Sequence, residues 1–402
     1  MPKRRSFNKK PRSWFRYLVS LGLVLSLISF FLRGVGPSTS SVSPQPPATL
    51  TEIRGVWLTN VASGVLFAPW GIKRAMQQLS QQNFNTVYPV AWNRGHTFYP
   101  SEVAKRFTGE FQEPLITFLY LGQDVLAEIL QQGHEQGLRI IPWFEYGFMA
   151  PKDSQLAKQH PDWISRSQQE TNNPQVWLNP LHPGVQQFLL ELILEVVRRY
   201  DVDGIQLDDH FGMPIELGYD AFTVQLYQQE HAGQSPPDDP ENPEWMIWRA
   251  NKITDFMETI FEEIKLVKPD CLVSLSPNYQ EFAYKHYLQD WLTWVERGLV
   301  EELVLQVYRD DLDSFQAQLS QTAIKLASRL IPVAVGILTG TPKQPVSIKQ
   351  IEQQVQLVRD NSLDGVSFFY WESLWSYLTP ESPQQRRKAF RRFLSSPTSV
   401  SN

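Results

Sequence analysis

The stretch DGIQLDDHFG, from Asp203 to Gly212, is the most informative segment of the sequence. It begins as an apolar strand and ends in two consecutive aspartates, whereas a strand that only filled a core would carry no charge. Successive side chains of a strand point to opposite faces, so Ile205 and Leu207 share one face and Gln206 and Asp208 share the other. The apolar pair is suited to lie under helices. The polar pair is therefore predicted to point to the opposite, inner side of the sheet.

Seven other runs of this kind complete the pattern. They are IRGVWL from Ile53, NTVYPV from Asn85, LRIIPWF from Leu138, CLVSLS from Cys271, LVLQVY from Leu303, IPVAVG from Ile331 and GVSFFY from Gly365. Segments with helical spacing separate them, and this alternation predicts parallel strands joined by right-handed crossovers. No G-x-G-x-x-G turn follows any of the runs, which argues against an open dinucleotide-binding sheet. Eight strand-helix units predict an α/β fold of the (β/α)₈ TIM-barrel type.

The lengths of the connections predict which end of the barrel carries the active site. Segments from helix to strand are short, whereas those after the second, third and fourth strands are long, spanning Ala91 to Leu121, Glu145 to His182 and Asp209 to Glu244. In a barrel of this type the active site lies among the loops at the C-terminal ends of the strands. Loops of this length usually have a function.

Carboxylates dominate the polar residues at the predicted strand ends. Glycoside hydrolysis generally needs two of them, one as acid and one as nucleophile or base. Asp208 is the predicted nucleophile or base. Glu145, beside the aromatic residues of the third strand, is the predicted acid, since an apolar setting raises a carboxyl pKa. Glu372, after the eighth strand, is an alternative acid, or a residue that binds a sugar hydroxyl.

Amides, aromatic rings and a histidine near the same strand ends are predicted to bind substrate. Tryptophans can stack on sugar rings, although they are also common core residues. The predicted substrate-binding residues are Asn60, Trp92, Asn93, Trp143, Gln206, Asp209, His210, Asn278, Tyr308 and Trp371. The sequence has no H-E-x-x-H motif and no phosphate-binding loop, so no metal and no other cofactor is predicted.

The N-terminus predicts export. Residues 1–36 combine a basic flank with an apolar run from Tyr17 to Leu32, read as an uncleaved membrane anchor or, alternatively, a cleaved signal. Residues 37–50 are a Pro/Ser-rich linker. The barrel is predicted to occupy residues 51–394, and residues 395–402 a disordered tail. These features predict a barrel outside the cytoplasm, held at the membrane by the N-terminal segment.

Charge excludes one class of partner. Removing the eight basic residues of positions 1–36 from the formal net charge of −5 leaves −13 for the remainder. A domain this acidic is poorly suited to bind nucleic acid.

Several motifs together resemble the glycosyl-hydrolase-like family ten. They are RGVWLTN on the first strand, NTVYPVAWNRGHTFYPS around the second, DGIQLDDHFG on the fourth, SLSPN on the fifth and LQVYRDD on the sixth. The likeness covers roughly Thr51 to Phe393. It implies a barrel glycosidase of the bacterial envelope acting on peptidoglycan glycan strands or a related exopolysaccharide, and it matches Asp208 to the family's acidic residue after the fourth strand. The ending IPWFEYGF departs from the W-F-N type of many relatives, which strengthens Glu372 as an alternative to Glu145.

Two other functions fit parts of the sequence. A barrel with aromatic residues but one effective carboxylate would bind a glycan without cutting it. A metal-dependent hydrolase would use Asp208, Asp209 and His210 as ligands.

Overall fold

The computed structural model describes residues 52–61, 63–68, 70–169, 173–375 and 379–395. The chain divides into two units, Met1–Leu50 and Thr51–Asn402, and the described residues belong to the second. The predicted N-terminal segment (1–36), the linker (37–50) and all of the predicted tail except its first residue lie outside them. Among the described residues no helix is both long and apolar enough to cross a membrane.

The described strands form a closed parallel barrel. Its staves in chain order are β1 (Ile53–Leu58), β2 (Thr86–Asn93), β4 (Arg139–Ile140) continued by β5 (Trp143–Phe144), β8 (Gly204–Asp208), β9 (Leu272–Ser276), β10 (Glu302–Gln306), β11 (Val333–Leu338) and β12 (Gly365–Phe369). The first strand pairs in parallel with both β2 and β12, which closes the sheet. The predicted (β/α)₈ TIM barrel is confirmed.

The third stave is interrupted between β4 and β5. Proline has no backbone N–H, so Pro142 cannot donate to the ladder at this point. Its carbonyl still accepts from the backbone N–H of Gln206 at 2.9 Å, and β5 pairs with β2 on one side and β8 on the other. The barrel therefore remains closed across the interruption.

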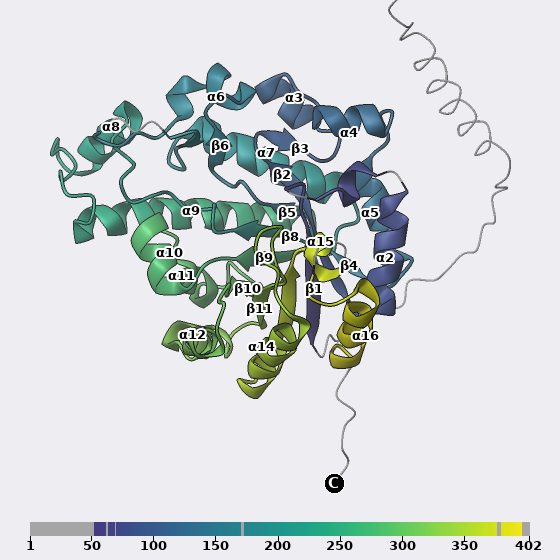
Figure 1. Ribbon diagram of the computed structural model, residues 1–402. Coiled ribbons are helices and arrows are strands. Elements are labelled where there is room, and N and C mark those ends of the chain that lie inside the picture. The colour runs from purple at the N-terminus through teal and green to yellow at the C-terminus, as the bar shows by residue number, and fades with distance from the viewer. Residues whose placement is uncertain (1–51, 62, 69, 170–172, 376–378, 396–402) are drawn as a thin grey trace, which may run out of the picture. The chain divides into compact units, whose positions relative to one another are not determined.

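Helices surround the strands in Figure 1. They are η1 (Val65–Phe67), α2 (Gly71–Gln81), α3 (Glu102–Thr108), α4 (Pro114–Leu119), α5 (Val125–His134), α6 (Gln155–Gln159), η2 (Pro161–Trp163), α7 (Pro183–Arg199), α8 (Ala221–Glu230), α9 (Pro243–Val267), α10 (Gln280–Tyr287), α11 (Trp291–Glu296), α12 (Leu312–Leu319), α13 (Thr322–Ala327), α14 (Ile348–Asp360), α15 (Trp371–Trp375) and α16 (Pro383–Phe393). The second helix shows why they pack. Its residues Ile72, Ala75, Met76 and Leu79 are fully buried, at the spacing that puts apolar side chains on one helical face.

The three long loops carry secondary structure of their own. The loop after β2 holds β3 (His96–Thr97), α3 and α4, and the loop after β8 holds α8. The loop after β5 holds α6, η2 and an antiparallel hairpin of β6 (Met149–Pro151) and β7 (Gln175–Trp177). The predicted long loops after strands two, three and four are thus confirmed, and they build up one end of the barrel.

Polar side chains fill part of the barrel interior. The indole N–H of Trp57 donates to Gln206 Oε1 at 2.8 Å, and Gln206 Nε2 donates to Ser274 Oγ at 3.0 Å. Deeper along the strands, Glu302 accepts from the hydroxyl of Tyr88 at 2.9 Å. These groups are buried and paired, which is the condition under which burial of polar groups is tolerated. They form the floor beneath the strand ends.

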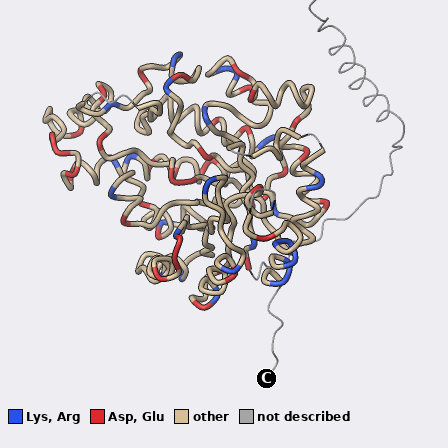
Figure 2. Tube along the Cα trace, in the orientation of Figure 1, with Lys and Arg blue, Asp and Glu red and all other residues tan. Residues whose placement is uncertain are grey.

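Charged residues of both signs are interspersed over the described chain (Figure 2). The most basic helix, α16, uses part of its charge internally. Arg386 is fully buried and donates to Glu381, and Arg392 pairs with Glu352 at 2.7 Å. Two of the five basic residues of α16 are therefore neutralised by carboxylates.

Candidate active site

A small cavity of about 130 Å³ opens at the C-terminal ends of the strands. Its walls come from β1, β5, β8, β9, β10, β12 and the residues that directly follow some of them. The lining residues are Trp57, Trp143, Glu145, Asp208, Asp209, His210, Ser276, Gln306, Tyr308 and Phe369. The structure thus brings together six of the predicted site residues, from strands three, four and six.

Asp208 ends β8 at the bottom of this cavity and is 1% exposed. Its Oδ2 accepts from the indole N–H of Trp143 at 3.1 Å, and its Oδ1 accepts from the backbone N–H of His210 at 2.9 Å. Burial raises the pKa of Asp208 to about 6, although the neighbouring His210 opposes the rise. At neutral pH the carboxylate is therefore ionised and fixed in orientation.

Glu145 directly follows β5 on the same cavity. Its Oε2 accepts from Asn93 Nδ2 at 2.7 Å. Burial raises the pKa of Glu145 to about 8, and the negative charge of Asp208 adds to the rise. Below this pH the group is mainly a neutral carboxylic acid, able to donate a proton.

His210 lies among the carboxyl groups as their counter-charge. Its Nδ1 lies 3.3 Å from Asp208 Oδ1 and 3.5 Å from Asp209 Oδ1. Burial lowers its pKa, but the charges of Asp209, Asp208 and Glu145 outweigh this and raise it to about 10. The imidazole is therefore a cation at neutral pH, which stabilises the ionised state of Asp208.

Amides hold the two outer carboxyl groups in place. Asp209 accepts from Asn278 Nδ2 at 2.9 Å and from Gln306 Nε2 at 3.1 Å. On the other side, Asn93 Nδ2 donates to Asn60 Oδ1 at 2.6 Å as well as to Glu145. The predicted residues Asn60, Asn93 and Asn278 thus lie behind the cavity wall, where they orient the carboxyl groups.

Two polar atoms at the site have no partner among the described residues. They are Ser276 Oγ, in the cavity lining, and Asn93 Oδ1. A buried polar atom without a hydrogen bond is costly, and such atoms are rare in native folds. Ser276 Oγ, which lies in the cavity lining, is therefore suited to bind a hydroxyl or amide group of a ligand.

Aromatic rings form the apolar part of the wall. The ring of Phe369 lies 6.1 Å from Trp57, 6.4 Å from Trp143 and 5.6 Å from Tyr308. Burial raises the pKa of the Tyr308 hydroxyl well above its usual range, so it remains a neutral donor. Rings and carboxyl groups side by side are what a sugar-binding cavity requires.

Besides Asn60, Asn93 and Asn278, four further predicted residues lie outside the cavity lining. Trp92 is fully buried and packs edge-on against Phe188 of α7, at 5.5 Å, on the helix side of its strand. Gln206 points inward as predicted, but it belongs to the barrel floor, where both ends of its amide are already bonded. Trp371 is 8% exposed and packs against Trp375 at 5.2 Å.

Glu372, the fourth, anchors the loop after β1. Its Oε1 accepts from the Ser63 hydroxyl at 2.5 Å, from the Gly64 N–H at 2.9 Å and from the Val65 N–H at 3.1 Å. Burial raises its pKa, while these donors oppose the rise. The geometry therefore favours Glu145 over Glu372 as the acid.

Sequence reasoning did not select four of the lining residues, Trp57, Ser276, Gln306 and Phe369. Each is the last or next-to-last residue of its strand. Their position is the signal that could have identified them, because residues at the C-terminal ends of six of the eight staves line the same cavity. Apart from Trp57, their residue types did not indicate a place in the site.

Three groups at this site could serve as metal ligands. Asp208, Asp209 and His210 offer ligand atoms that lie within 4.8 Å of one another. A histidine binds a metal through a neutral nitrogen, so metal binding here would have to displace the proton that the surrounding carboxylates hold on His210. Two carboxylates and one imidazole are nevertheless ligand types that zinc and manganese accept.

The fold and the site together define a class. A closed (β/α)₈ barrel carries, at the C-terminal ends of its strands, an ionised carboxylate and a protonated carboxyl group among aromatic rings. This is the arrangement of a TIM-barrel glycosidase.

The chain belongs to the family Glycosyl hydrolase-like 10, whose sequence profile matches residues 52–358. The predicted family and the predicted enzyme class, glycoside hydrolase, are thereby confirmed. Glycosyl hydrolase DigH of Escherichia coli (strain K12) is 26% identical over 332 residues, covering 68% of this chain and 71% of that protein. Glycosyl hydrolase YngK of Bacillus subtilis (strain 168) is 23% identical over 338 residues, covering 74% of this chain and 60% of that protein.

Solved structures share the fold. The glycoside hydrolase domain of PgaB (BpsB) from Bordetella bronchiseptica matches with a TM-score of 0.64 at 12% identity, covering 87% of this chain and 100% of that one. The catalytic domain of β-amylase from Paenibacillus polymyxa matches with a TM-score of 0.59 at 10% identity, covering 86% of this chain and 98% of that one. At these identities the likeness concerns the barrel architecture.

Proposed function

We propose that this enzyme cleaves O-glycosidic bonds of an envelope polysaccharide, with peptidoglycan glycan strands as the first candidate, through two carboxyl groups. The observation that carries the proposal is that the carboxyl groups of Glu145 and Asp208 line one small cavity together with aromatic rings. Burial raises the pKa of both groups, and that of Glu145 further. Two carboxyl groups whose surroundings push their pKa values apart are suited to acid and nucleophile or base roles.

In the proposed mechanism Glu145 donates its proton to the glycosidic oxygen as the bond breaks. Asp208, ionised and held by Trp143 and His210, faces the positive charge that develops on the sugar ring. It acts either as the nucleophile or as the base that activates water. The cation of His210 keeps Asp208 from taking up the proton that Glu145 must deliver.

Hydrogen bonds to the two carboxyl groups maintain this division of roles. Asn93 donates to Glu145, and the Trp143 indole donates to Asp208, so neither carboxyl group can rotate freely. Preorganised groups of this kind lower the barrier because little reorientation is needed during the reaction.

We further propose that the barrel acts outside the cytoplasm, held at the membrane by the N-terminal segment. The basic flank followed by an apolar run and a Pro/Ser-rich linker supports this topology. Protease added to intact spheroplasts should remove the barrel. Full protection of the barrel would refute the topology.

The proposed activity is tested by incubating the full-length protein, purified in detergent, with amidase-stripped and with intact peptidoglycan. Products are identified by mass spectrometry, and the Asp208→Asn variant is the control. Release of glycan fragments by the wild type alone is expected. Release of fragments by neither protein would contradict the proposed substrate.

A metal-dependent hydrolysis is the second candidate, favoured by the proximity of Asp208, Asp209 and His210. Elemental analysis of the purified protein distinguishes the two. One tightly held zinc or manganese per chain, with activity lost on its removal, would replace the two-carboxylate mechanism.

A further inference from the structure

A second and larger cavity, of about 660 Å³, lies among the long loops after β5 and β8. One side is built from β7 and from described residues between β6 and β7, with Lys152, Arg166 and Trp177 in the wall. The other side comes from the loop after β8, with Pro214 and Glu216. None of these residues lines the small cavity that holds Glu145 and Asp208.

Trp177, in the wall of the larger cavity, lies beside a wall residue of the small cavity. Its ring centroid lies 6.4 Å from that of His210, a wall residue of the small cavity. The indole N–H donates to the backbone carbonyl of Gly212 at 2.9 Å, which fixes the ring. Trp177 is partly exposed and lines the larger cavity, so its ring is placed to stack on a sugar of a chain that continues outward from the catalytic groups.

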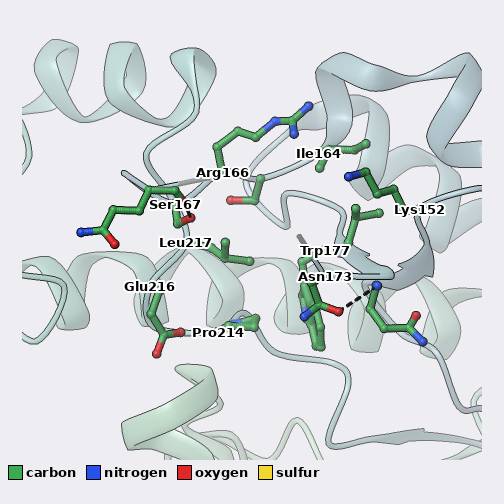
Figure 3. Close-up of a pocket in the computed structure, with 13 residues that line it drawn as sticks. Lys152, Ile164, Arg166, Ser167, Asn173, Trp177, Pro214, Glu216 and Leu217 are labelled. Atoms are coloured by element: carbon green, nitrogen blue, oxygen red, sulfur yellow. Dashed lines mark hydrogen bonds between the residues drawn. The ribbon is translucent and has the colours of Figure 1, made fainter. Parts of the chain in front are cut away.

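The larger cavity is lined by two basic residues, Lys152 and Arg166, although the domain as a whole is acidic. In Figure 3 the charged ends of Lys152 and Arg166 lie on the same side of the cavity, and the carboxyl group of Glu216 lies on the opposite side. Neither cation has an ion pair within the described part of the chain. Among the described residues that line this cavity, the two cations outnumber the one carboxylate, so the lining favours an anion.

We propose that this cavity is a distal subsite that binds a sugar carrying a carboxylate, with Trp177 stacked on the ring and Lys152 and Arg166 paired with the acidic group. Guanidinium and ammonium groups form their strongest hydrogen bonds with carboxylates. The inference rests on the proposed function, since it extends the same glycan from the catalytic cavity. The shared chemistry is a carboxylate on a pyranose, either as a uronic acid or as a lactyl ether.

Binding is measured by calorimetry on the full-length protein carrying Asp208→Asn, which prevents turnover during the titration. The probes are an oligosaccharide with lactyl-ether carboxylates, one with uronic acids, and the carboxyl-reduced form of each. At least one acidic probe should bind about tenfold more tightly than its reduced form, and the preferred one identifies the source of the carboxylate. Equal affinity for the acidic and the reduced forms of both probes would overturn the proposal.

Variants test whether the preference for acidic over carboxyl-reduced probes arises in this cavity. Adding Lys152→Gln and Arg166→Gln together should abolish it, while Lys349→Gln, at an exposed position on α14, should leave it intact. Both lysines and Arg166 are exposed, so the fold is expected to tolerate all three changes. A preference that persists in the double variant would overturn the assignment.

Cleavage of the same probes by the wild-type chain separates this proposal from the proposed function. Hydrolysis without any carboxylate preference in binding would overturn the subsite and leave the glycosidase activity standing. Carboxylate-dependent binding without hydrolysis of any probe would support the subsite and count against the proposed reaction.

Discussion

Glu145 and Glu372 both follow an aromatic pair at the end of a barrel strand, and burial raises the pKa of both. They differ in what they face. Glu145 lines the small cavity opposite an ionised Asp208, whereas Glu372 is held by three donors from the loop after β1. Burial alone therefore does not make a catalytic acid. The nearby charge and an open side toward substrate distinguish the two groups.

The largest loss of turnover is expected when Asp208, the carboxylate beside Glu145, is replaced. Asp208→Asn should lower turnover by at least about 10²- to 10⁴-fold, because it removes the charge that faces the oxocarbenium-like transition state. Asn is nearly isosteric, so the melting temperature should change little. Turnover above about a tenth of the wild-type value would show that the catalytic centre does not lie on β8.

The second largest loss of turnover is expected when the proposed acid, Glu145, is replaced. Glu145→Gln should lower turnover of a natural glycan by about 10²- to 10³-fold, since Gln cannot donate the proton. A substrate with a dinitrophenol leaving group, which needs no protonation, should restore most of the rate. The same rescue seen in Glu372→Gln, and absent in Glu145→Gln, would reverse the assignment.

The pH profile tests the electrostatic part of the argument. The active state has Asp208 ionised, which requires a pH above about 6, and Glu145 protonated, which requires a pH below about 8. The rate should fall by about tenfold for each unit below the first value and above the second. A profile that stays flat from pH 5 to 9 would contradict these roles.

The smallest effect on catalysis is expected at the loop anchor. Glu372→Ala leaves the Ser63 hydroxyl and the Gly64 and Val65 N–H groups without their acceptor. Unfolding should become easier by about 1–3 kcal/mol, with turnover at low temperature within a few-fold of wild type. Thermal unfolding and kinetics on the same preparation measure both. A loss of turnover as large as that of Glu145→Gln, at unchanged stability, would place Glu372 in the reaction.

The barrel could be predicted because each stave is a short apolar run, and the catalytic face because long loops follow three of them. The placement of Trp92 could not, since the pairing of β2 with β5 shifts register between Val90 and Trp92. Such a bulge changes the face to which the following side chains point. Simple alternation therefore fails from that residue onward.

The depth of a side chain inside the barrel and its contacts with distant parts of the chain could also not be predicted from the sequence. Gln206 points inward as alternation requires, but nothing in the pattern says that it lies below Asp208 on the floor. Glu372 is bonded to Ser63, 309 positions earlier in the chain, and no local signal reports that contact. Both outcomes depend on how the staves are staggered around the barrel.

The β6–β7 hairpin forms part of the wall of the larger cavity and is an insertion between one stave and its helix. Apart from Trp177, which lies beside His210, its residues in that wall are separate from the residues that line the small cavity. For protein engineering, residues 152–169 and 173–177 are therefore the positions at which to vary the glycan preference that we propose for the larger cavity, while Glu145 and Asp208 are kept unchanged.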